Sequence, residues 1–306
     1  MQTILGAGGA IGKSLAEALT KYNTPVRLVS RNPKPVIGNE ELVPADLLQL
    51  SQAQKAVAGS EVVYLAAGLP YKLAVWQKQW PVVMANTIAA CKKHGSKLVF
   101  FDNNYLYAAD EMPHQTERSR VNPPSKKGAV RAGLVKQLEA AMQEGLQVVI
   151  ARAADFYGPG ISTSMLQETV YANLKKGKKA MLLGSATKKH NYTFTPDAGA
   201  ATALLGNTPD AYGAVWHLPS SEALTGKQWV ELFATAMGKE ARYSQLPPLM
   251  LQVLGVFVPI MRELSEMRYQ SNQDYFFDSS KFVQRFPSFT TTPAASAVQQ
   301  IVAVGK

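Results

Sequence analysis

The amino-acid sequence predicts an α/β fold, in which a doubly wound parallel sheet is followed by a smaller, mostly helical C-terminal lobe. Two observations predict it. Apolar segments with strand and helix spacing alternate along the first half of the chain, and three glycines, Gly6, Gly9 and Gly12, lie between the first strand and the first helix. Alternating strands and helices form parallel sheets with right-handed crossovers. The alternation weakens from about Phe156, where we expect the smaller lobe to begin.

The predicted elements follow one another from the N-terminus. Apolar residues with helical spacing follow the glycines, at Ile11, Leu15, Ala18 and Leu19. A strand at 26–30 then completes a strand–helix–strand unit. Further strands are expected at 41–46, 61–67, 97–101 and 146–151, helices at 82–94 and 126–144, and one more strand that returns to the sheet at 212–218.

The glycine loop predicts a binding site for a nucleotide pyrophosphate. A sharp turn, a close approach of the backbone to phosphate and tight packing of the helix each exclude a Cβ atom. The N–H groups and the positive end of the following helix then face the anion. An ordinary strand–turn–helix connection is the alternative, but the strand–helix–strand context favours a dinucleotide cofactor in a Rossmann-type fold. The expected contacts are Gly6, Gly9, Ala10, Ile11 and Gly12.

Ser30 and Arg31 stand at the end of the second predicted strand, where the residue type distinguishes NAD from NADP. An acid at this place hydrogen-bonds the free 2′-hydroxyl, whereas an arginine accommodates a 2′-phosphate. No acid stands here, so the residues favour NADP; NAD stays possible, and Arg31 is then a surface arginine at a strand end. We expect an NAD(P)-binding Rossmann domain over residues 1–155, with the return strand near 212–218, and a substrate-binding lobe over residues 156–306.

Composition narrows the class of protein further. With 306 residues, 46% of them hydrophobic and 18% charged, the chain is expected to be globular. Its one cysteine, Cys91, forms no intrachain disulfide, and the sequence opens without a leader pattern, so we expect a cytoplasmic protein. The apolar segment 249–261 is too short to span a membrane and is expected to pack over a substrate pocket.

The net charge of +10 is concentrated in part in a stretch without acids, residues 169–196. This stretch would attract phosphates or an acidic partner, or it is a solvated surface. No aromatic interleaving or nucleic-acid motif accompanies it, which favours the second interpretation. We therefore expect a small-molecule substrate and neither nucleic acid nor membrane as a partner, with the chain a monomer or a homodimer.

In their order, these segments resemble the extended or atypical short-chain dehydrogenase/reductase superfamily, and within it the NAD-dependent epimerase/dehydratase-like proteins. The likeness covers most of the chain. The matching pieces are the glycine loop, Val43-Pro44-Ala45-Asp46-Leu47, Ala66-Ala67-Gly68, Leu106-Tyr107, Arg152-x-x-x-Phe156-Tyr157-Gly158-Pro159-Gly160 and Trp216-His217-Leu218-Pro219. The resemblance implies that Asp46 contacts the adenine and that Leu47, Ala66, Ala67 and Lys127 lie at the cofactor.

The resemblance also implies a catalytic set that this sequence lacks. Family catalysis uses a Ser or Thr that polarises the substrate oxygen, a Tyr acid/base and a Lys that holds the nicotinamide ribose. Alignment on Leu106-Tyr107 puts Asn103 in place of the Ser or Thr, and alignment on the helix after Pro123-Pro124 puts Lys127 and Arg131 in place of the Tyr and the Lys. The usual hydride and proton mechanism is therefore not carried over intact.

Two interpretations of Lys127 and Arg131 compete. At i and i+4 they share a helix face. In a partly buried cleft, the fixed guanidinium would disfavour a charged ammonium, so that Lys127 acts as an acid/base near neutrality while Arg131 holds the ribose. On an exposed face, the two cations would only be solvated or attract phosphate. Asn103 would donate its amide to a substrate oxygen, and Tyr105, after the fifth strand, is a second source of a proton.

Our leading hypothesis is an NADP-binding enzyme that performs a redox, epimerase or dehydratase step on a small organic substrate, nucleotide-sugars included. Nicotinamide would supply the hydride chemistry. The alternative is a protein that has lost catalysis and reports redox state through NADP binding. The four histidines are scattered, and neither a zinc-type spacing nor a Gly-x-Ser-x-Gly motif is present, so we expect no metal site and no serine hydrolysis.

Overall fold

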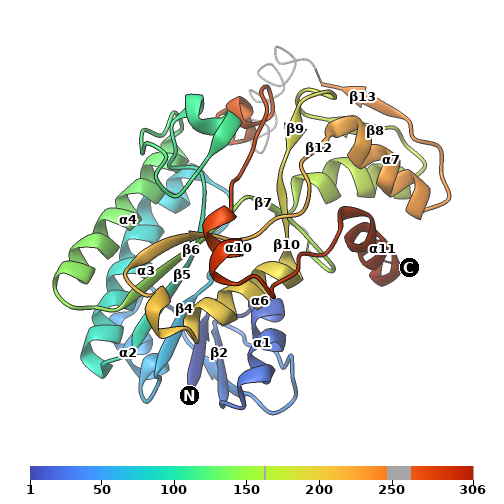
Figure 1. Cartoon of the computed structure of the whole chain (residues 1–306). Coiled ribbons are helices and arrows are strands. Elements are labelled where there is room, and N and C mark those ends of the chain that lie inside the picture. Colours follow the sequence, from blue (N-terminus) through green and yellow to red (C-terminus); the bar gives the residue numbers. More distant parts are fainter. Residues whose placement is uncertain (162, 247–262, 306) are drawn as a thin grey trace. The chain divides into compact units, whose positions relative to one another are not determined.

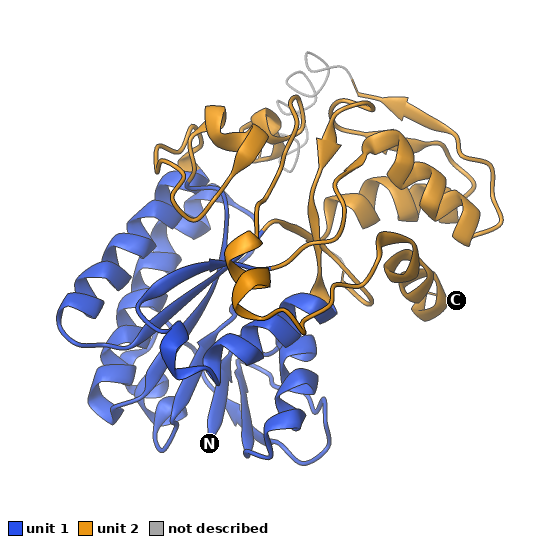
Figure 2. Cartoon of the chain, in the orientation of Figure 1, with its two compact units in different colours: residues 1–106, 127–153, 196–218 blue, residues 107–126, 154–195, 219–306 orange. Residues whose placement is uncertain are grey.

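A computed structural model describes residues 1–161, 163–246 and 263–305 (Figure 1). The apolar segment 249–261 lies outside the described residues. Two compact units alternate along the chain (Figure 2). Unit 1 comprises residues 1–106, 127–153 and 196–218, and unit 2 comprises residues 107–126, 154–195 and 219–306. The expected division after residue 155 places segment 107–126 in the first domain, whereas here it groups with unit 2. The functional assignment of the two domains stays a prediction.

Unit 1 is built on a seven-stranded sheet with the order β11-β6-β5-β4-β1-β2-β3, in which every neighbouring pair is parallel. Its strands are β1 (Gln2–Leu5), β2 (Val26–Ser30), β3 (Glu41–Pro44), β4 (Val62–Leu65), β5 (Lys97–Asn103), β6 (Val148–Ala153) and β11 (Ala214–His217). The predicted doubly wound, Rossmann-type sheet is therefore confirmed, return strand included. The strand order reverses between β1 and β4, and sheets of this kind bind their ligands at such a switch point.

Helices cover both faces of this sheet, which explains why every residue of β4 and β6 is buried. In Figure 1, α2, α3 and α4 lie on one side and α1 and α6 on the other. The helical segments are α1 (Gly12–Leu19), η1 (Thr20–Tyr22), α2 (Leu50–Val57), α3 (Leu73–His94), α4 (Lys126–Gln143), α6 (Thr195–Gly206) and η4 (Pro209–Ala211). Within the described residues, no helix is both long and apolar enough to cross a membrane.

Helix α3 begins at Leu73, well before the expected start at Val82, and it runs through Pro81. The sequence-based start was wrong because a proline usually stands in the first turn of a helix. A proline inside a helix costs about 3 kcal/mol. The earlier turns bury Trp76 and Trp80 in the core of unit 1, and each large apolar side chain contributes roughly 1.5–3 kcal/mol on burial, which offsets that cost.

Unit 2 combines short helices with three two-stranded sheets that have their own core around Tyr157, Trp229 and Phe233. The strand pairs are β7 (Asp155–Tyr157) with β10 (Tyr192–Phe194), β8 (Ala180–Leu182) with β13 (Tyr243–Gln245), and β9 (Lys189–His190) with β12 (Leu224–Thr225). The helical segments are η2 (Ala109–His114), η3 (Gln167–Tyr171), α5 (Ala172–Lys175), α7 (Gly226–Ala236), η5 (Arg268–Gln270), α10 (Ser280–Arg285) and α11 (Ala294–Val304). Strands this short carry no readable alternation, so the sequence indicated only a mostly helical lobe.

Candidate functional site

The glycine loop after β1 has the geometry of a pyrophosphate cradle. Gly6 has a φ of +92°, and a Cβ atom there would lie 2.2 Å from the Cα atom of Ala67. A Cβ at Gly12 would lie 2.4 Å from the carbonyl oxygen of Ala7, and one at Gly9 would lie 3.1 Å from the carbonyl oxygen of Ala66. Gly6 and Gly12 therefore have to be glycine, and the loop passes close to the residues that follow β4.

Backbone hydrogen bonds fix this loop beside the neighbouring strand. The N–H groups of Gly6 and Ala7 donate to the carbonyl oxygen of Val29 at 2.8 and 3.1 Å, and the N–H of Gly9 donates to Gly6 at 2.9 Å. Helix α1 begins at Gly12 without a side-chain cap. The first N–H groups of a helix and its positive dipole end favour an anion. The residues of this loop therefore fit the pyrophosphate of a dinucleotide.

The residues expected around the adenosine lie at the ends of β2, β3 and β4. Arg31 follows β2 and is exposed. Asp46 lies just after β3, where its carboxylate accepts a hydrogen bond from the N–H of Leu48 at 3.0 Å. The N–H of Ala66 donates to the carbonyl oxygen of Leu5 at 2.9 Å, which holds the segment after β4 beside the glycine loop. All of them lie at the carboxyl ends of parallel strands, where ligands bind in such sheets.

Lys127 and Tyr105 meet the same group of aromatic rings in unit 1. The Lys127 side chain is fully buried, and its Nζ lies 4.6 Å from the centre of the Tyr71 ring. The Tyr71 ring contacts the Trp76 ring edge to face with ring centres 5.6 Å apart, and the Tyr105 ring stacks on the Trp76 ring with centres 6.3 Å apart. The two candidates for proton transfer therefore share one aromatic neighbourhood, although they come from α4 and from the segment after β5.

Arg131 is held by a buried carboxylate. Its Nε and Nη2 atoms donate to Oδ1 of Asp102 at 2.8 and 2.5 Å, and Nε of Arg152 donates to Oδ2 at 3.0 Å. The Arg131 guanidinium also lies 4.7 Å from the ring centre of Phe100 and 4.8 Å from that of Trp80. All three charged side chains are at most 4% exposed. Two guanidinium groups thus share one carboxylate between β5, β6 and α4.

Sequence reasoning assigned no role to Asp102 or Arg152. The available signal was a charge within an apolar strand, because Asp102 follows Leu98–Phe101 directly. Acids and arginines are almost never fully buried unless they are paired. Arg152 belongs to one of the segments that resemble the family, but only its ion pair in the structure shows that its partner is Asp102.

A hydrogen bond within its own turn orients the side chain of Asn103. Its side-chain oxygen accepts a hydrogen bond from the N–H of Tyr105 at 3.2 Å. The amide nitrogen makes no hydrogen bond within the described part of the chain, so it is available as a donor. An amide donor at the carboxyl end of β5 can polarise a substrate oxygen, as the Ser or Thr hydroxyl of the family would.

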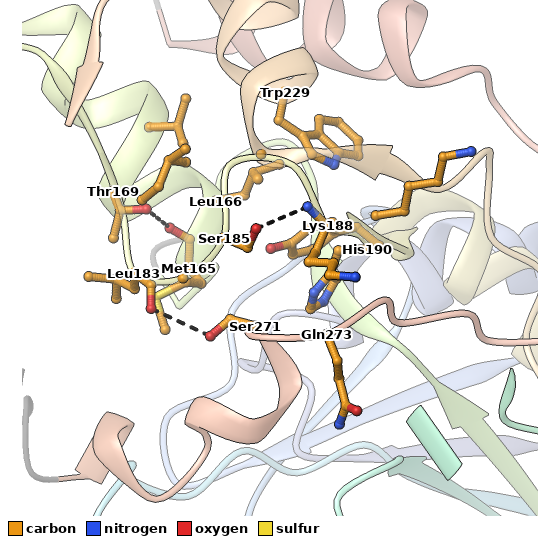
Figure 3. A pocket seen from close by; sticks show the side chains of 16 residues that line it. Met165, Leu166, Thr169, Leu183, Ser185, Lys188, His190, Trp229, Ser271 and Gln273 are labelled. Carbon is orange, nitrogen blue, oxygen red and sulfur yellow. Dashed lines mark hydrogen bonds between the residues drawn. The ribbon is translucent and has the colours of Figure 1, made fainter. Parts of the chain in front are cut away.

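Unit 2 contains a separate hollow with a volume of about 70 Å³ (Figure 3). We call it the unit-2 hollow. One part of its wall is apolar, with Leu166, Val170 and Trp229, and another is polar. The polar lining comes from Thr169, Ser185, Lys188, Lys189, His190, Ser271 and Gln273.

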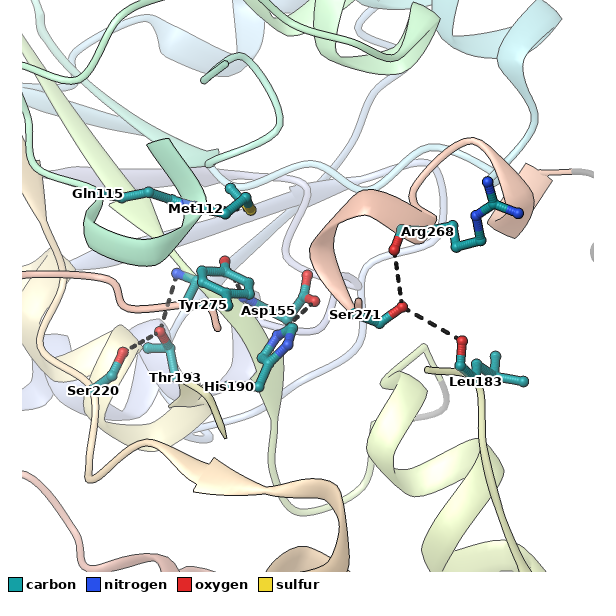
Figure 4. A network of polar contacts seen from close by, with 11 residues as sticks. Met112, Gln115, Asp155, Leu183, His190, Thr193, Ser220, Arg268, Ser271 and Tyr275 are labelled. Carbon is teal, nitrogen blue, oxygen red and sulfur yellow. Dashed lines mark hydrogen bonds and ion pairs between the residues drawn. The ribbon is translucent and has the colours of Figure 1, made fainter. Parts of the chain in front are cut away.

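His190 connects this hollow to a buried polar network (Figure 4). Its Nε2 atom lies 3.2 Å from Oδ2 of Asp155. The imidazole stacks on Tyr192 with ring centres 4.3 Å apart and meets Tyr275 at 4.1 Å. Burial, and secondarily the charge of Asp155, raises the pKa of both tyrosines far above the ordinary value. Both phenols therefore keep their protons at neutral pH.

The fold and the glycine loop define a protein with a nicotinamide-dinucleotide-binding fold. The sequence pattern of the NAD dependent epimerase/dehydratase family matches residues 3–216, so the chain belongs to this family. The resemblance found in the sequence is thereby confirmed. A search of the curated proteins finds no match.

Similar solved structures share the whole fold at low sequence identity. MoeE5 in complex with UDP-glucose and NAD is 20% identical, with a TM-score of 0.80 over 99% of this chain and 98% of that one. The Thermus thermophilus UDP-glucose 4-epimerase in complex with NAD is 17% identical, with a TM-score of 0.79 over 99% and 98%. The Bacillus cereus UDP-glucuronic acid 4-epimerase, in complex with UDP-glucuronic acid and NAD, is 17% identical, with a TM-score of 0.81 over 99% and 98%.

Proposed function

We propose that this protein is an enzyme that uses a nicotinamide dinucleotide for a redox, epimerase or dehydratase step on a sugar nucleotide or a related carbonyl or alcohol. The observation that carries the proposal is the glycine loop, where Gly6 and Gly12 leave no room for a Cβ atom. The bound cofactor supplies the hydride chemistry. The residues that would hold it are Gly6, Gly9, Ala10, Ile11, Gly12, Ser30, Arg31, Asp46, Leu47, Ala66 and Ala67.

We assign proton transfer and polarisation of the substrate oxygen to residues around the aromatic rings of unit 1. We assign acid/base work to Lys127, whose Nζ is buried against Tyr71, and hydrogen-bond donation to the free amide of Asn103. Tyr105 is the second source of a proton. Arg131 was expected to hold the ribose, but its hydrogen bonds to Asp102 favour a positioning role, in which it fixes α4 one turn beyond Lys127.

The substrate class rests on two observations. Three of the similar structures named above contain a UDP-sugar or carry the name of an enzyme that acts on one. The unit-2 hollow offers the Trp229 ring together with Lys188 and Lys189, a lining that suits an organic molecule with an anionic part. We propose that the hollow holds part of such a substrate.

The choice between NADP and NAD depends on Arg31. No acid ends β2, and the exposed guanidinium of Arg31 favours the 2′-phosphate of NADP, whereas the similar structures contain NAD. We expect NADPH to bind about tenfold more tightly than NADH and Arg31→Asp to reverse this preference. Fluorescence titration of both cofactors measures it, with Lys34→Asp as a matched control on the next exposed cation. Tighter NADH binding by the unmodified chain would overturn the NADP assignment.

Turnover of a substrate panel tests the proposed function. The chain is incubated with each dinucleotide and with UDP-sugars and simple carbonyls and alcohols, and the products are separated by chromatography and identified by mass. Chromatography is necessary because an epimer has the mass of its substrate and because an epimerase returns the hydride, leaving nicotinamide absorbance unchanged. A new product supports the enzyme; products from no member of the panel contradict the substrate class.

One observation favours a second candidate, a redox sensor without catalysis. Asn103 does not readily transfer a proton, and Arg131 is committed to Asp102, so two of the three family catalytic positions hold groups unsuited to the usual steps. Tight binding of the dinucleotide with no turnover, together with a change in thermal stability that differs between oxidised and reduced cofactor, would support this function.

A further inference from the structure

Helix α6 approaches the beginning of α1 more closely than a Cβ atom at the contact would allow. Gly199, the fifth residue of α6, is buried. A Cβ atom there would lie 2.5 Å from the carbonyl carbon of Ser14, and 2.7 Å from both the carbonyl oxygen of Ser14 and the backbone nitrogen of Leu15. Because these are backbone atoms, no change of a side-chain rotamer would make room. The contact therefore requires either glycine at position 199 or a displaced α1.

The backbone that Gly199 meets belongs to the first turn of α1. This helix begins at Gly12, and the N–H of Leu15 donates to the carbonyl oxygen of Ile11 at 2.9 Å, which closes the turn. The first N–H groups of a helix have no partner within it and favour an anion. Helices α1 and α6 lie side by side on one face of the sheet (Figure 1). A residue far along the chain thus contacts the turn that we expect to face the pyrophosphate.

Gly199 adds a third steric restraint to those that the glycine loop contains. Gly6 is packed against Ala67, and Gly12 is packed against the carbonyl group of Ala7. These two contacts fix the loop beside the segment after β4 and fix the start of α1 on the loop. Gly199 restrains the same helix start from α6. Hydrogen bonds from N–H groups to anionic oxygens depend steeply on distance and angle, so displacement of this turn would weaken them.

We propose that Gly199 is a positioning residue of the dinucleotide site. Its lack of a side chain allows α6 to hold the first turn of α1 where the N–H groups of that turn donate to the pyrophosphate. The inference rests on the cofactor site of the proposed function, and the ligand is the pyrophosphate of a nicotinamide dinucleotide. Gly199 acts through α1 and not by contact with the cofactor.

Gly199→Ala tests the proposal beside two matched Gly→Ala substitutions in helices of unit 1. We expect its Kd for the preferred dinucleotide to rise by about tenfold, the loss of about one hydrogen bond to a charged group. Gly133→Ala in α4 should keep the Kd within about twofold, because a Cβ at Gly133 would meet no described atom beyond its own helix within 4 Å. Fluorescence titration measures the Kd of each variant.

Gly206→Ala separates a loss of stability from a loss of binding. Gly206 is the last residue of α6, and a Cβ there would lie 2.3 Å from the hydroxyl oxygen of the buried Tyr64. This variant should therefore unfold at a lower temperature than the unmodified chain but keep its Kd within about twofold. Thermal unfolding of all three variants identifies the folded ones.

The part of the cofactor that binds more weakly shows whether the helix start has moved. ADP carries a pyrophosphate and adenosine does not. Gly199→Ala should raise the Kd of ADP by about the same factor as that of the dinucleotide, and change the Kd of adenosine by less than about twofold. Ligand-observed nuclear magnetic resonance measures both fragments at millimolar concentration. An equal loss for ADP and adenosine would contradict the proposal.

Hydrogen exchange of the unmodified chain decides the matter if Gly199→Ala does not fold. Binding of the dinucleotide should then slow amide exchange in the first turns of α6 as well as in the glycine loop. Unchanged exchange in α6 would overturn the role of Gly199.

The remaining failures are distinguishable. A folded Gly199→Ala variant that binds the dinucleotide as tightly as the unmodified chain, or an equal rise of Kd in Gly206→Ala, overturns the role of Gly199 and leaves the proposed function intact. No binding of either dinucleotide by the unmodified chain overturns the cofactor site and this inference with it.

Discussion

Replacing Lys127 by alanine is expected to lower kcat by about 10²–10⁴-fold on any substrate that the protein turns over, the range that a positioned acid/base contributes. The reason is the location of the Lys127 side chain, which is fully buried with its Nζ atom 4.6 Å from the centre of the Tyr71 ring. We expect a smaller effect on the Kd of the dinucleotide, because we propose that the glycine loop holds the pyrophosphate. Steady-state kinetics and cofactor titration together measure the two effects.

Lys126→Ala is the matched control for this substitution. Lys126 precedes Lys127 on the first turn of α4 but is exposed, so its loss should change kcat less than about twofold. A Lys127→Ala variant with the kcat of the unmodified chain would contradict the acid/base assignment and leave Tyr105 as the candidate. An equal loss in both variants would point to disruption of the helix start rather than to chemistry.

Replacing Asp102 by alanine is expected to reduce the free energy of unfolding by about 3–5 kcal/mol, the usual cost of removing one partner from a buried ion pair. Arg131 and Arg152 would keep their positive charges in a buried setting and lose the carboxylate that both of them contact. Urea unfolding followed by circular dichroism measures the change, and the variant should also bind the dinucleotide more weakly because β5 and α4 are no longer fixed together.

Asp110→Ala provides the comparison. Asp110 also pairs with an arginine, Arg120, but both side chains are more than half exposed, and surface pairs contribute less than about 1 kcal/mol. If both variants lose the same small amount of stability, the buried cluster does not stabilise unit 1, and the positioning role of Arg131 loses its support.

Local patterns predicted most of the sheet and its cofactor loop. The strand at 26–30 and the helix from Lys126 were predicted from local sequence and are confirmed. The glycines were informative for a steric reason, which the contacts of Gly6 with Ala67 make explicit. Helix α3 was predicted only from Val82, whereas it begins at Leu73 and contains Pro81.

The polar clusters were not predictable in the same way. Asp102 and Arg152 are 50 residues apart in the sequence, and only the pairing of β5 with β6 brings them together. His190 and Asp155 likewise come from different strands of unit 2, and the sequence offered only scattered histidines. Tertiary contacts between residues far apart in the chain leave no periodic signal, so the networks around the candidate sites had to come from the structure.

Rapid mixing with substrate tests most directly whether this protein performs nicotinamide chemistry. The chain is loaded with the oxidised dinucleotide, mixed with UDP-glucose or with the panel member that gives a product, and followed by the near-ultraviolet absorbance of reduced nicotinamide. We expect a transient of reduced cofactor in the unmodified chain and a transient slowed by about 10²–10⁴-fold in Lys127→Ala. Binding of both dinucleotide and substrate with neither reduced nicotinamide nor a product would contradict the enzyme and favour the redox sensor.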